Sequence, residues 1–443
     1  MRRSGAKMKA VAFYTLGCKV NQYETAALAS LFARRGYRIV EDFESIADVY
    51  VINTCTVTGT ADQKSRQAIR RAIRRNPEAV VVVTGCYAQV NPEAVAGIPG
   101  VDVVVGTFGR EGLVDLVEEA MRTGRQVVAV REFPAGCKFE ELPALFTTRT
   151  RAYLKIQEGC RDFCTFCLVP YARGPLRSRK PEAVLAEARR LLAAGFKEVV
   201  LTGIHIGLYG CDLQPPVTLA ELVARVLELP GIERLRLSSL EPTEVTPELV
   251  ALIARDSRFC PHLHIPLQSG DDGVLRRMGR RYTTAAYAET VHFLRAKVPE
   301  IAITTDVMVG FPGETDAAFA RSVAFVRQIG FAGLHVFKFS PRPGTPAATF
   351  ADQVPGPVKE KRLGVLLEVG AALSHTFAAR FSGRTVNVLV EGKNEAGFWE
   401  GLSEHYLPVA FTAGGDLRGL IVPVRVREVK GKLLCGELLT EYS

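Results

Sequence analysis

Apolar and polar residues alternate along the first 130 residues as they do in strands followed by helices. The apolar runs that predict strands lie at residues 10–15, 49–53, 80–84 and 101–105. The patterns that predict helices lie at residues 24–35, 65–75 and 110–122. Strands that alternate with helices pair in parallel through crossover connections, so residues 8–130 are predicted to form an α/β domain with a parallel sheet.

The alternation is lost over residues 131–150, which we interpret as a linker, and then returns. Six further apolar runs lie at 153–156, 198–201, 234–237, 262–265, 301–309 and 334–339. Six strand–helix units in series predict a partial (β/α)6 barrel over residues 151–380, with its site at the carboxyl ends of the strands. From residue 381 to residue 443, short strands punctuated by glycines predict a small antiparallel β-barrel.

Composition narrows the class of protein. The chain has 443 residues, 47% of them hydrophobic and 23% charged, which is long enough for several globular domains. Apolar stretches such as 79–83 fall far short of the roughly 20 residues of a membrane-spanning helix. The first apolar run is broken by Tyr14, Thr15 and Gly17, which favours a strand over a secretory signal. We therefore expect a cytoplasmic protein whose ten cysteines are metal ligands or catalytic thiols rather than a disulfide framework.

Three cysteines each end an apolar run: Cys18, Cys55 and Cys86. The carboxyl ends of parallel strands open onto one crevice, so the three thiols are expected to meet there. Each also precedes a possible helix, whose N-terminal amides favour the thiolate that iron ligation needs. A small buried residue at a strand end is the alternative for any one of them, but it explains three equivalent positions less well.

A second set of cysteines, Cys160, Cys164 and Cys167, lies within eight residues directly after a predicted strand. Closely spaced thiolates on one loop can wrap a single iron–sulfur cubane, and three of them leave one iron open to another ligand. Zinc is the alternative, although structural zinc sites use two CxxC pairs or Cys with His, and no second pair follows in the sequence.

The CxxxCxxC pattern resembles the radical S-adenosylmethionine superfamily. The segments TLGCKVNQYE, INTCTVT and VTGCYAQ are similar to the N-terminal domain of the methylthiotransferases. Their radical domain resembles KIQEGCRDFCTFCLVPYARGPLRSR, LTGIHIG, HLHIPLQSG and DVMVGFPGE, and the residues from 381 on resemble a TRAM RNA-binding domain. Lys19, Val20 and Asn21 after Cys18 look most like the threonylcarbamoyladenosine tRNA enzymes, whereas isopentenyladenosine enzymes tend to show GCQMN and ribosomal-protein enzymes GCPKN.

The resemblance implies two [4Fe-4S] clusters, with S-adenosylmethionine as radical source and methyl donor. Cys160, Cys164 and Cys167 would hold the radical-generating cluster, and Cys18, Cys55 and Cys86 an auxiliary cluster that carries the sulfur to be inserted. The resemblance also suggests residues near the cofactor, for each of which a turn residue that ends a barrel strand is the alternative. These are Phe166, Thr202, Gly203, Ser239, Glu241, His264, Gln268, Gly310 and Glu314.

Positive charge is concentrated in a few segments of a chain with 56 Lys and Arg against 47 Asp and Glu. Residues 64–75 place Ala68, Ile69, Ala72 and Ile73 on one helical arc and six cations on the other. Such clusters can position a phosphate backbone, although a solvated helix face is the alternative. The chain from 377 to 443 has equal numbers of acids and bases, so RNA binding there would need a local patch. The candidate RNA contacts are Lys64, Arg66, Arg70, Arg71, Arg74, Arg75, Arg177, Arg425 and Arg427.

The leading hypothesis is a radical enzyme that methylthiolates C2 of N6-threonylcarbamoyladenosine at tRNA position 37. Its partners would be that tRNA, a sulfur donor and an electron donor of flavodoxin or ferredoxin type. Methylthiolation of isopentenyladenosine or of a ribosomal-protein aspartate is the enzymatic alternative. An iron–sulfur module that only binds RNA or transfers electrons is the non-enzymatic one.

Overall fold

The structure is a computed structural model that describes residues 8–142, 144 and 150–439. Part of the predicted linker, residues 143 and 145–149, and residues 440–443 of the predicted C-terminal barrel lie outside the described residues. The chain divides into two compact units. The N-terminal unit holds the residues up to 147 together with Gln157–Arg179 and Ser340–Thr345, and the barrel unit holds the rest. The cysteine-bearing loop after residue 157 therefore groups with the N-terminal unit.

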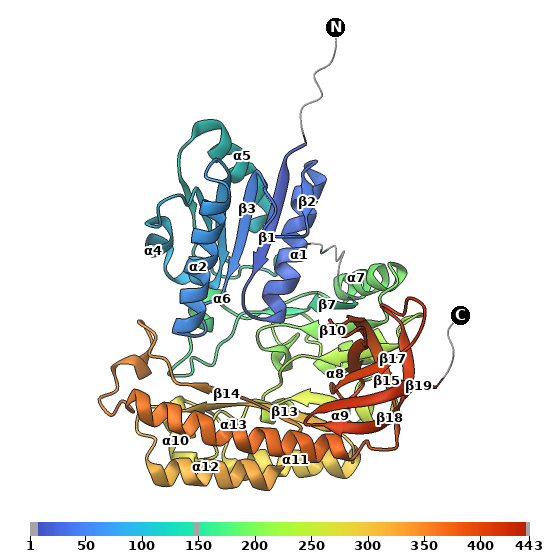
Figure 1. Ribbon diagram of the computed structural model, residues 1–443. Helices are drawn as coiled ribbons and strands as arrows, with labels where there is room; N and C mark the ends of the chain where they lie inside the picture. Colours follow the sequence, from blue (N-terminus) through green and yellow to red (C-terminus); the bar gives the residue numbers. More distant parts are fainter. Residues whose placement is uncertain (1–7, 143, 145–149, 440–443) are drawn as a thin grey trace. The chain divides into compact units, whose positions relative to one another are not determined.

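The N-terminal unit is built on a six-stranded parallel sheet (Figure 1). The strands lie in the order β2-β1-β3-β4-β5-β6. Their bounds are β1 Ala10–Thr15, β2 Arg38–Val40, β3 Val49–Thr54, β4 Val80–Gly85, β5 Val103–Val105 and β6 Val127–Ala129. The helices between them are α1 Lys19–Arg34, α2 Gly59–Arg75, α3 Cys86–Val90, α4 Pro92–Ala96 and α5 Leu113–Thr123. The four predicted strands and three predicted helices are present, and β2, β6, α3 and α4 are additional.

The sheet of the N-terminal unit is buried on both faces, which explains its valine-rich strands. On one face, Tyr50 and Ile52 of β3 pack with Ala68, Ile69 and Ala72 of α2. On the other, neighbouring residues of the same strands pack with α1 and α5. Successive side chains of a strand point to opposite faces, so a central strand covered on both sides is apolar throughout. The predicted apolar arc of α2 is thus confirmed.

The cysteine-bearing loop is closed at its base by a short antiparallel pair, β8 Gln157–Glu158 with β9 Arg177–Ser178. It includes one short helix, α6 Val169–Arg173. Gly159 has φ +80°, and a Cβ there would lie 1.9 Å from the carbonyl oxygen of Pro175. Only glycine fits this close backbone approach at the neck of the loop.

The barrel unit begins with two three-stranded parallel sheets. One has the order β11-β10-β7, with β7 Arg151–Lys155, β10 Glu198–Thr202 and β11 Arg234–Leu237. The other has the order β12-β13-β14, with β12 His262–His264, β13 Ala302–Val309 and β14 Gly333–Lys338. Parallel bridges between Leu235 and Phe259 and between Ser239 and His264 join the two sheets. The six strands follow chain order around a partial barrel, as predicted.

Helices follow the barrel strands in sequence and cover their outer face (Figure 1). They are α7 Pro181–Ala193, α8 Leu219–Leu227, α9 Pro247–Arg255, α10 Asp272–Met278, α11 Thr284–Lys297, α12 Asp316–Ile329 and α13 Gly356–Ala379. Residues 385–438 form a closed five-stranded barrel in the order β15-β16-β17-β19-β18. Its strands are β15 Thr385–Lys393, β16 Trp399–Ser403, β17 Pro408–Thr412, β18 Ile421–Lys430 and β19 Leu433–Leu438. The pairs are antiparallel except β17 with β19, which is parallel.

The small barrel is anchored to the start of the β/α strands by buried charges. Glu198 forms ion pairs with Arg236 at 3.1 Å and with Arg234 at 3.5 Å. Both arginines also donate to backbone carbonyls of the small barrel, including Ser403 and Leu402. Glu198 and Arg236 are fully buried, so each needs the other to offset the loss of solvent.

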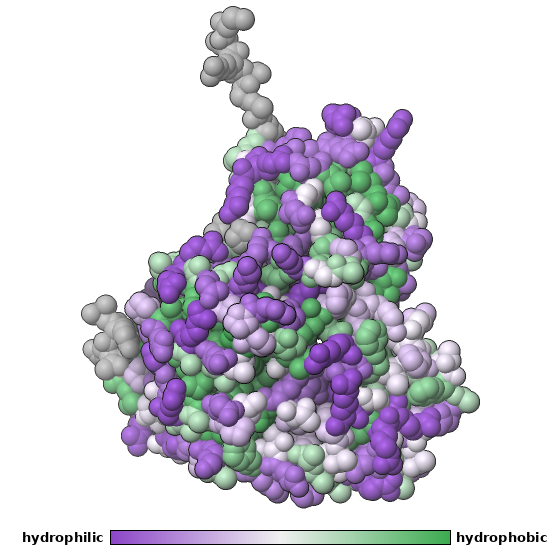
Figure 2. Space-filling view, turned by 180° about the vertical axis from the view of Figure 1, so that it is seen from behind, coloured by the Kyte–Doolittle hydropathy of each residue, from purple (hydrophilic) through white to green (hydrophobic). Residues whose placement is uncertain are grey.

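The surface is mixed in character. On the face drawn in Figure 2, hydrophilic and hydrophobic residues are interspersed. None of the helices in the described part of the chain combines the length and apolarity that a membrane crossing requires.

Candidate iron–sulfur and cofactor sites

The first three candidate ligands follow strands that are neighbours in the N-terminal sheet. Cys18 precedes α1, Cys55 comes directly after β3, and Cys86 is the first residue of α3, after β4. The strands β1, β3 and β4 are adjacent in the sheet, so their carboxyl ends lie at one edge. The order of the strands in the sheet thus brings these strand ends together, as the sequence predicted.

Hydrogen bonds hold the three strand ends together. The Nδ2 of Asn21, in the first turn of α1, donates to the carbonyl of Leu16 at 2.7 Å and to that of Thr54 at 3.0 Å. The hydroxyl of Thr54 donates to the carbonyl of Thr84 at 2.6 Å. The loop that bears Cys18 is thereby tied to the end of β3, and the end of β3 to the end of β4.

A close approach between Gly17 and Cys55 confirms that two of the three cysteine segments touch. Gly17 has φ +99°, and a Cβ there would lie 2.9 Å from the Cβ and 3.0 Å from the Sγ of Cys55. Any side chain at Gly17 would therefore fill the space beside the Cys55 thiol. The Nδ2 of Asn21 would lie 3.2 Å from the same Cβ, so the glycine allows the Cys18 loop to pack closely against Cys55 and Asn21.

These three cysteines are better suited to binding iron than to reacting as free thiol nucleophiles. Burial raises the pKa of Cys55, and it raises the pKa of Cys86 to about 12. Buried thiols with raised pKa values are poor nucleophiles, whereas a metal ion deprotonates the thiols that bind it. Cys18 is exposed, so the edge of this site is open to another ligand.

Arg173 links the cysteine-bearing loop to this edge of the sheet. Its guanidinium is fully buried and forms ion pairs with Glu24 at 2.5 Å and Glu158 at 2.9 Å. Its Nε donates to the Sγ of Cys86 at 3.2 Å, and its Nη2 donates to the Oδ1 of Asn21. A positive charge against a thiolate would stabilise an anionic cluster at Cys86.

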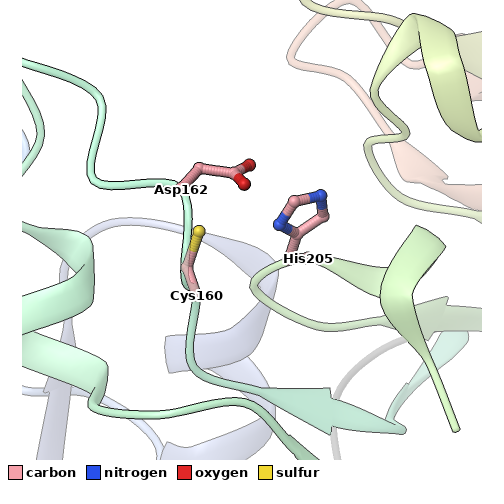
Figure 3. Close-up of side chains that lie close together, drawn as sticks. All are labelled: Cys160, Asp162 and His205. Carbon is pink, nitrogen blue, oxygen red and sulfur yellow. The ribbon is translucent and has the colours of Figure 1, made fainter. Parts of the chain in front are cut away.

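The second set of candidate ligands lies on the loop itself. The amide of Cys167 donates to the carbonyl of Cys164 at 2.9 Å, and the amide of Val169 donates to the Sγ of Cys167 at 3.4 Å. Phe163 has φ +47°, so the chain turns sharply between the first and second cysteines. Figure 3 shows Cys160 and Asp162 extending from the same stretch of this loop. Three half-buried thiols on one turning loop suit a cubane with an open iron.

The barrel unit places most of the predicted cofactor residues at the carboxyl ends of successive strands. Thr202 is the last residue of β10, and Gly203 comes directly after it. Ser239 and Glu241 follow the end of β11. His264 is the last residue of β12, and Gly310 comes directly after β13. Phe166 belongs to the other unit, the N-terminal one, where it is on the cysteine-bearing loop.

Gln268 is the candidate whose geometry points most directly to a ligand. It has φ +63°, although it is not glycine, and its side chain is 8% exposed. Its Oε1 has no hydrogen-bond partner among the residues that the structure describes. A buried acceptor without a partner on a strained turn is expected where a ligand supplies the missing donor.

Two of the carboxylates already have protein partners. The Oε2 of Glu314 accepts from the amide of Gly310 at 2.7 Å and from Arg362 at 2.7 Å. Burial nevertheless raises the pKa of Glu314 above its ordinary value. Glu241 pairs with Arg280. Both acids therefore shape the turns at the strand ends, and Glu314 holds the Gly310 turn in place.

His205, to which the sequence assigned no role, follows β10 (Figure 3). It pairs with Glu244. The close packing of this pair explains Gly207, since a Cβ there would lie 2.0 Å from a carboxylate oxygen of Glu244. This interaction is within the barrel unit, and the imidazole of His205 is buried.

The candidate RNA contacts divide by exposure. On α2, Lys64, Arg70, Arg74 and Arg75 are exposed. Arg66 is half-buried and donates to the hydroxyl of Tyr87, and Arg71 pairs with Glu44. On β18, Arg425 and Arg427 are exposed, and Arg427 pairs with Glu437. The cluster on α2 is thus the more available of the two.

Arg177 is placed differently from the expectation. It is 2% exposed, and its Nη2 donates to the carbonyl of Arg173 at 3.0 Å. Its guanidinium also lies over the rings of Phe108 and Phe133. A buried arginine with these partners is not available to an RNA phosphate, so Arg177 belongs to the packing of the N-terminal unit. The prediction that Arg177 contacts RNA is therefore wrong, and the neighbouring Arg173 is buried as well.

Sequence reasoning missed the partners that the fold supplies. Glu24 and Glu158 are 149 and 15 residues from Arg173. Both lie inside the segments TLGCKVNQYE and KIQEGCRDFCTFCLVPYARGPLRSR, but the sequence assigned neither of them a role. Their burial beside a cationic partner is visible only in the tertiary structure. A local hint is that Asn21 and Glu24, three residues apart in α1, share one face of the helix that begins after Cys18.

Comparisons with known proteins agree with this architecture. Residues 10–106 match the uncharacterized protein family UPF0004, and residues 154–326 match the radical SAM superfamily. A Bacillus subtilis protein named threonylcarbamoyladenosine tRNA methylthiotransferase MtaB is 46% identical over 95% of this chain and 94% of its own length. A Thermotoga maritima protein of the same name is 38% identical over 98% of each chain.

More distant relatives bear another name. A Clostridium botulinum protein named tRNA-2-methylthio-N(6)-dimethylallyladenosine synthase is 34% identical over 96% of this chain and 95% of its own length. Among solved structures, the radical S-adenosylmethionine methyltransferase TsrM from Kitasatospora setae matches with a TM-score of 0.57 and 18% identity, over 77% of this chain and 74% of that one. At that identity the likeness concerns the fold alone.

Proposed function

Because the chain belongs to the radical S-adenosylmethionine methylthiotransferase family, we propose that it attaches a methylthio group to C2 of N6-threonylcarbamoyladenosine at position 37 of tRNA. The observation that carries the proposal is the pairing of two three-cysteine sets within the N-terminal unit. The name of the Bacillus subtilis relative supports the choice of substrate.

Each cysteine set has a separate task in this proposal. Cys160, Cys164 and Cys167 would hold the cluster that binds S-adenosylmethionine, and Cys18, Cys55 and Cys86 would hold an auxiliary cluster. When bound, these groups supply the radical, the sulfur and the methyl group that ordinary side chains cannot provide at an unactivated aromatic C–H bond. A sulfur donor and an electron donor of flavodoxin or ferredoxin type would serve the reaction.

The chain's own residues would hold the clusters, the cofactor and the RNA in place. The buried Arg173 holds its positive charge against Cys86 and ties the two cysteine sets into one folded unit. Gln268 offers an unpaired acceptor at the strand ends of the barrel unit. The exposed cations of α2 would hold the phosphate backbone without reading bases.

Methylthiolation of isopentenyladenosine is the second candidate, because the relatives named for that family of substrates are 34–35% identical over nearly the whole chain. The higher identity of the threonylcarbamoyladenosine relatives favours the first.

The test is nucleoside mass spectrometry of tRNA from a strain that lacks this gene. Loss of the methylthio form of threonylcarbamoyladenosine, restored by the intact gene, is the expected result. Genes with Cys160→Ala or Cys55→Ala should fail to restore it, while the exposed Cys211→Ala should restore it fully. Loss of the methylthio form of isopentenyladenosine instead would overturn the choice of substrate.

A further inference from the structure

Three polar side chains meet on neighbouring strands of the barrel unit. The Nε2 of His264 lies 3.3 Å from the Oδ2 of Asp306, and the Nδ1 of His335 lies 3.3 Å from the Oδ1. The two imidazoles are stacked with their centroids 5.5 Å apart. The carboxylate of Asp306 on β13 thus bridges the imidazoles of His264 on β12 and His335 on β14.

These side chains lie on the inner face of the strands. On β14, Lys338 pairs with Glu360 of α13, and Leu334 contacts α13 at Gly370. Leu334 and Lys338 therefore face the covering helix, and His335, at the intervening parity, faces the other way. Asp306 is the register partner of His335 on β13, so it shares that inner face.

The cluster is accessible to a ligand. His264 is 13% exposed, Asp306 29% and His335 72%. Burial raises the pKa of the Asp306 carboxyl, but the hydrogen bonds and charges of the two imidazoles lower it more, so the net pKa is well below the ordinary value. A ligand that enters the inner face would meet a carboxylate flanked by two hydrogen-bonding rings.

Hydrogen bonds and ring contacts with further residues hold the His264 ring in place. The hydroxyl of Thr304 lies 3.0 Å from the Nδ1 of His264 and 3.1 Å from the Nε2 of His262. The ring of His262 in turn stacks on Tyr406, whose own ring lies under the guanidinium of Arg236. This inner surface is polar, whereas the interior of a closed β/α barrel is filled by branched aliphatic residues.

We propose that His264, Asp306 and His335 bind the polar substituent on N6 of the substrate adenosine. Asp306 accepts hydrogen bonds from the N–H groups of the threonylcarbamoyl arm, and His335 donates to its carboxylate. The proposal rests on the proposed function and deepens it, because it assigns the residues that recognise this modification.

The chemistry of the alternative substituent supports this choice. A hydrocarbon such as isopentenyl offers no hydrogen bond, so its entry would desolvate three polar groups without replacing their water. A site built to hydrogen-bond its ligand rejects an analogue that lacks those groups far more strongly than an apolar site rejects an added polar group. The cluster therefore selects for the polar arm.

The test measures binding and turnover with RNA stem-loops that carry threonylcarbamoyladenosine, isopentenyladenosine or unmodified adenosine at position 37. The cluster variant is His335→Phe, which keeps a ring of similar size at a 72% exposed position. Its matched control is His292→Phe, at an exposed position on α11. The fully assembled enzyme is used throughout.

We expect His335→Phe to raise the Kd and KM for the threonylcarbamoyl stem-loop at least tenfold and to leave the Kd for the unmodified one unchanged. His292→Phe should change neither value. An equal loss for both stem-loops would indicate a merely structural role and overturn the proposal. So would an unchanged preference in His335→Phe.

Two further results concern the substrate itself and a bound metal ion. If the wild-type enzyme does not act on the threonylcarbamoyl stem-loop, the proposed function itself fails. Because the donor atoms of the three residues lie within 4.8 Å of one another, a divalent metal ion could occupy the same place. Loss of the wild-type preference after EDTA treatment, with the iron content unchanged, would assign the cluster to a metal and overturn recognition by hydrogen bonds.

Discussion

The Nε of Arg173 donates a hydrogen bond to the Sγ of Cys86 across 3.2 Å, although 87 residues separate them in the chain. Arg173 ends the short helix α6 of the cysteine-bearing loop, and Cys86 begins a helix after a strand of the N-terminal sheet. The contact therefore joins the segments that carry the two candidate cluster sites. A substitution of Arg173 should therefore change the surroundings of the Cys86 thiol, although the two residues are far apart in the sequence.

Replacement of Arg173 tests this link. Arg173→Met removes one of the ion-pair partners of Glu158 and one of those of Glu24, both of which are buried. Leaving buried carboxylates short of a cation costs about 3–5 kcal/mol, so the free energy of unfolding should fall by that order. Urea unfolding measures it, with the exposed Arg70→Met as control. A loss below about 1 kcal/mol would contradict the buried network, since that is the scale of exposed ion pairs.

The space beside Cys55 can be tested with two glycines. Gly17→Ala places a Cβ about 3 Å from the Cys55 thiol, whereas Gly36→Ala, at φ +80°, meets no described atom within 4 Å. Both changes carry the cost of a left-handed backbone, about 1–2 kcal/mol. Only Gly17→Ala should also lower the iron content after anaerobic reconstitution, toward half of the wild-type value. Equal iron contents in the two variants would mean that Gly17 does not shape a cluster site.

The cations of α2 should control the salt dependence of tRNA binding. Arg74 and Arg75 are exposed, and Arg189 and Arg190 on α7 are an exposed pair of the same charge. Each lost phosphate contact lowers the slope of log K against log salt by about 0.7–0.9. Arg74→Ala with Arg75→Ala should therefore flatten the slope, and Arg189→Ala with Arg190→Ala should not. The same slope in both double variants would place the RNA elsewhere.

His405 gives the barrel unit a stability that depends on pH. Burial lowers its pKa to about 4, Arg384, Arg236 and Arg380 lower it as well, and Glu300 opposes them. The unfolded chain takes up the proton near pH 6.5, before the folded chain does. The stability that the neutral His405 contributes is therefore fully present above about pH 6.5 and is lost as the pH drops toward 4. The total loss from this group is on the order of 3 kcal/mol.

Urea unfolding between pH 7 and pH 4 checks this dependence. His405→Gln should flatten the profile over that range, because it removes the titrating group. His292→Gln, at an exposed position on α11, should leave the profile unchanged. A wild-type profile as flat as that of His405→Gln would contradict the assignment.

Local sequence determined most of the secondary structure and the order of the elements. The apolar runs predicted at residues 10–15 and 234–237 are strands with those bounds. Strands that alternate with helices could pair only in parallel, so the carboxyl ends of β1, β3 and β4 had to share an edge. The spacing of Cys160, Cys164 and Cys167 likewise needed no tertiary information, because the three lie on one loop.

The tertiary structure alone decided which charges are buried and which side chains of distant strands meet. The sequence shows Arg173 and Arg177 as part of a run of cations, but the fold turns both inward, since Glu24 and Glu158 offset their desolvation. His264, Asp306 and His335 carry no common motif and are brought together by strand register. Sequence patterns report a residue's own neighbours along the chain. Burial and register depend on the other elements that pack against them.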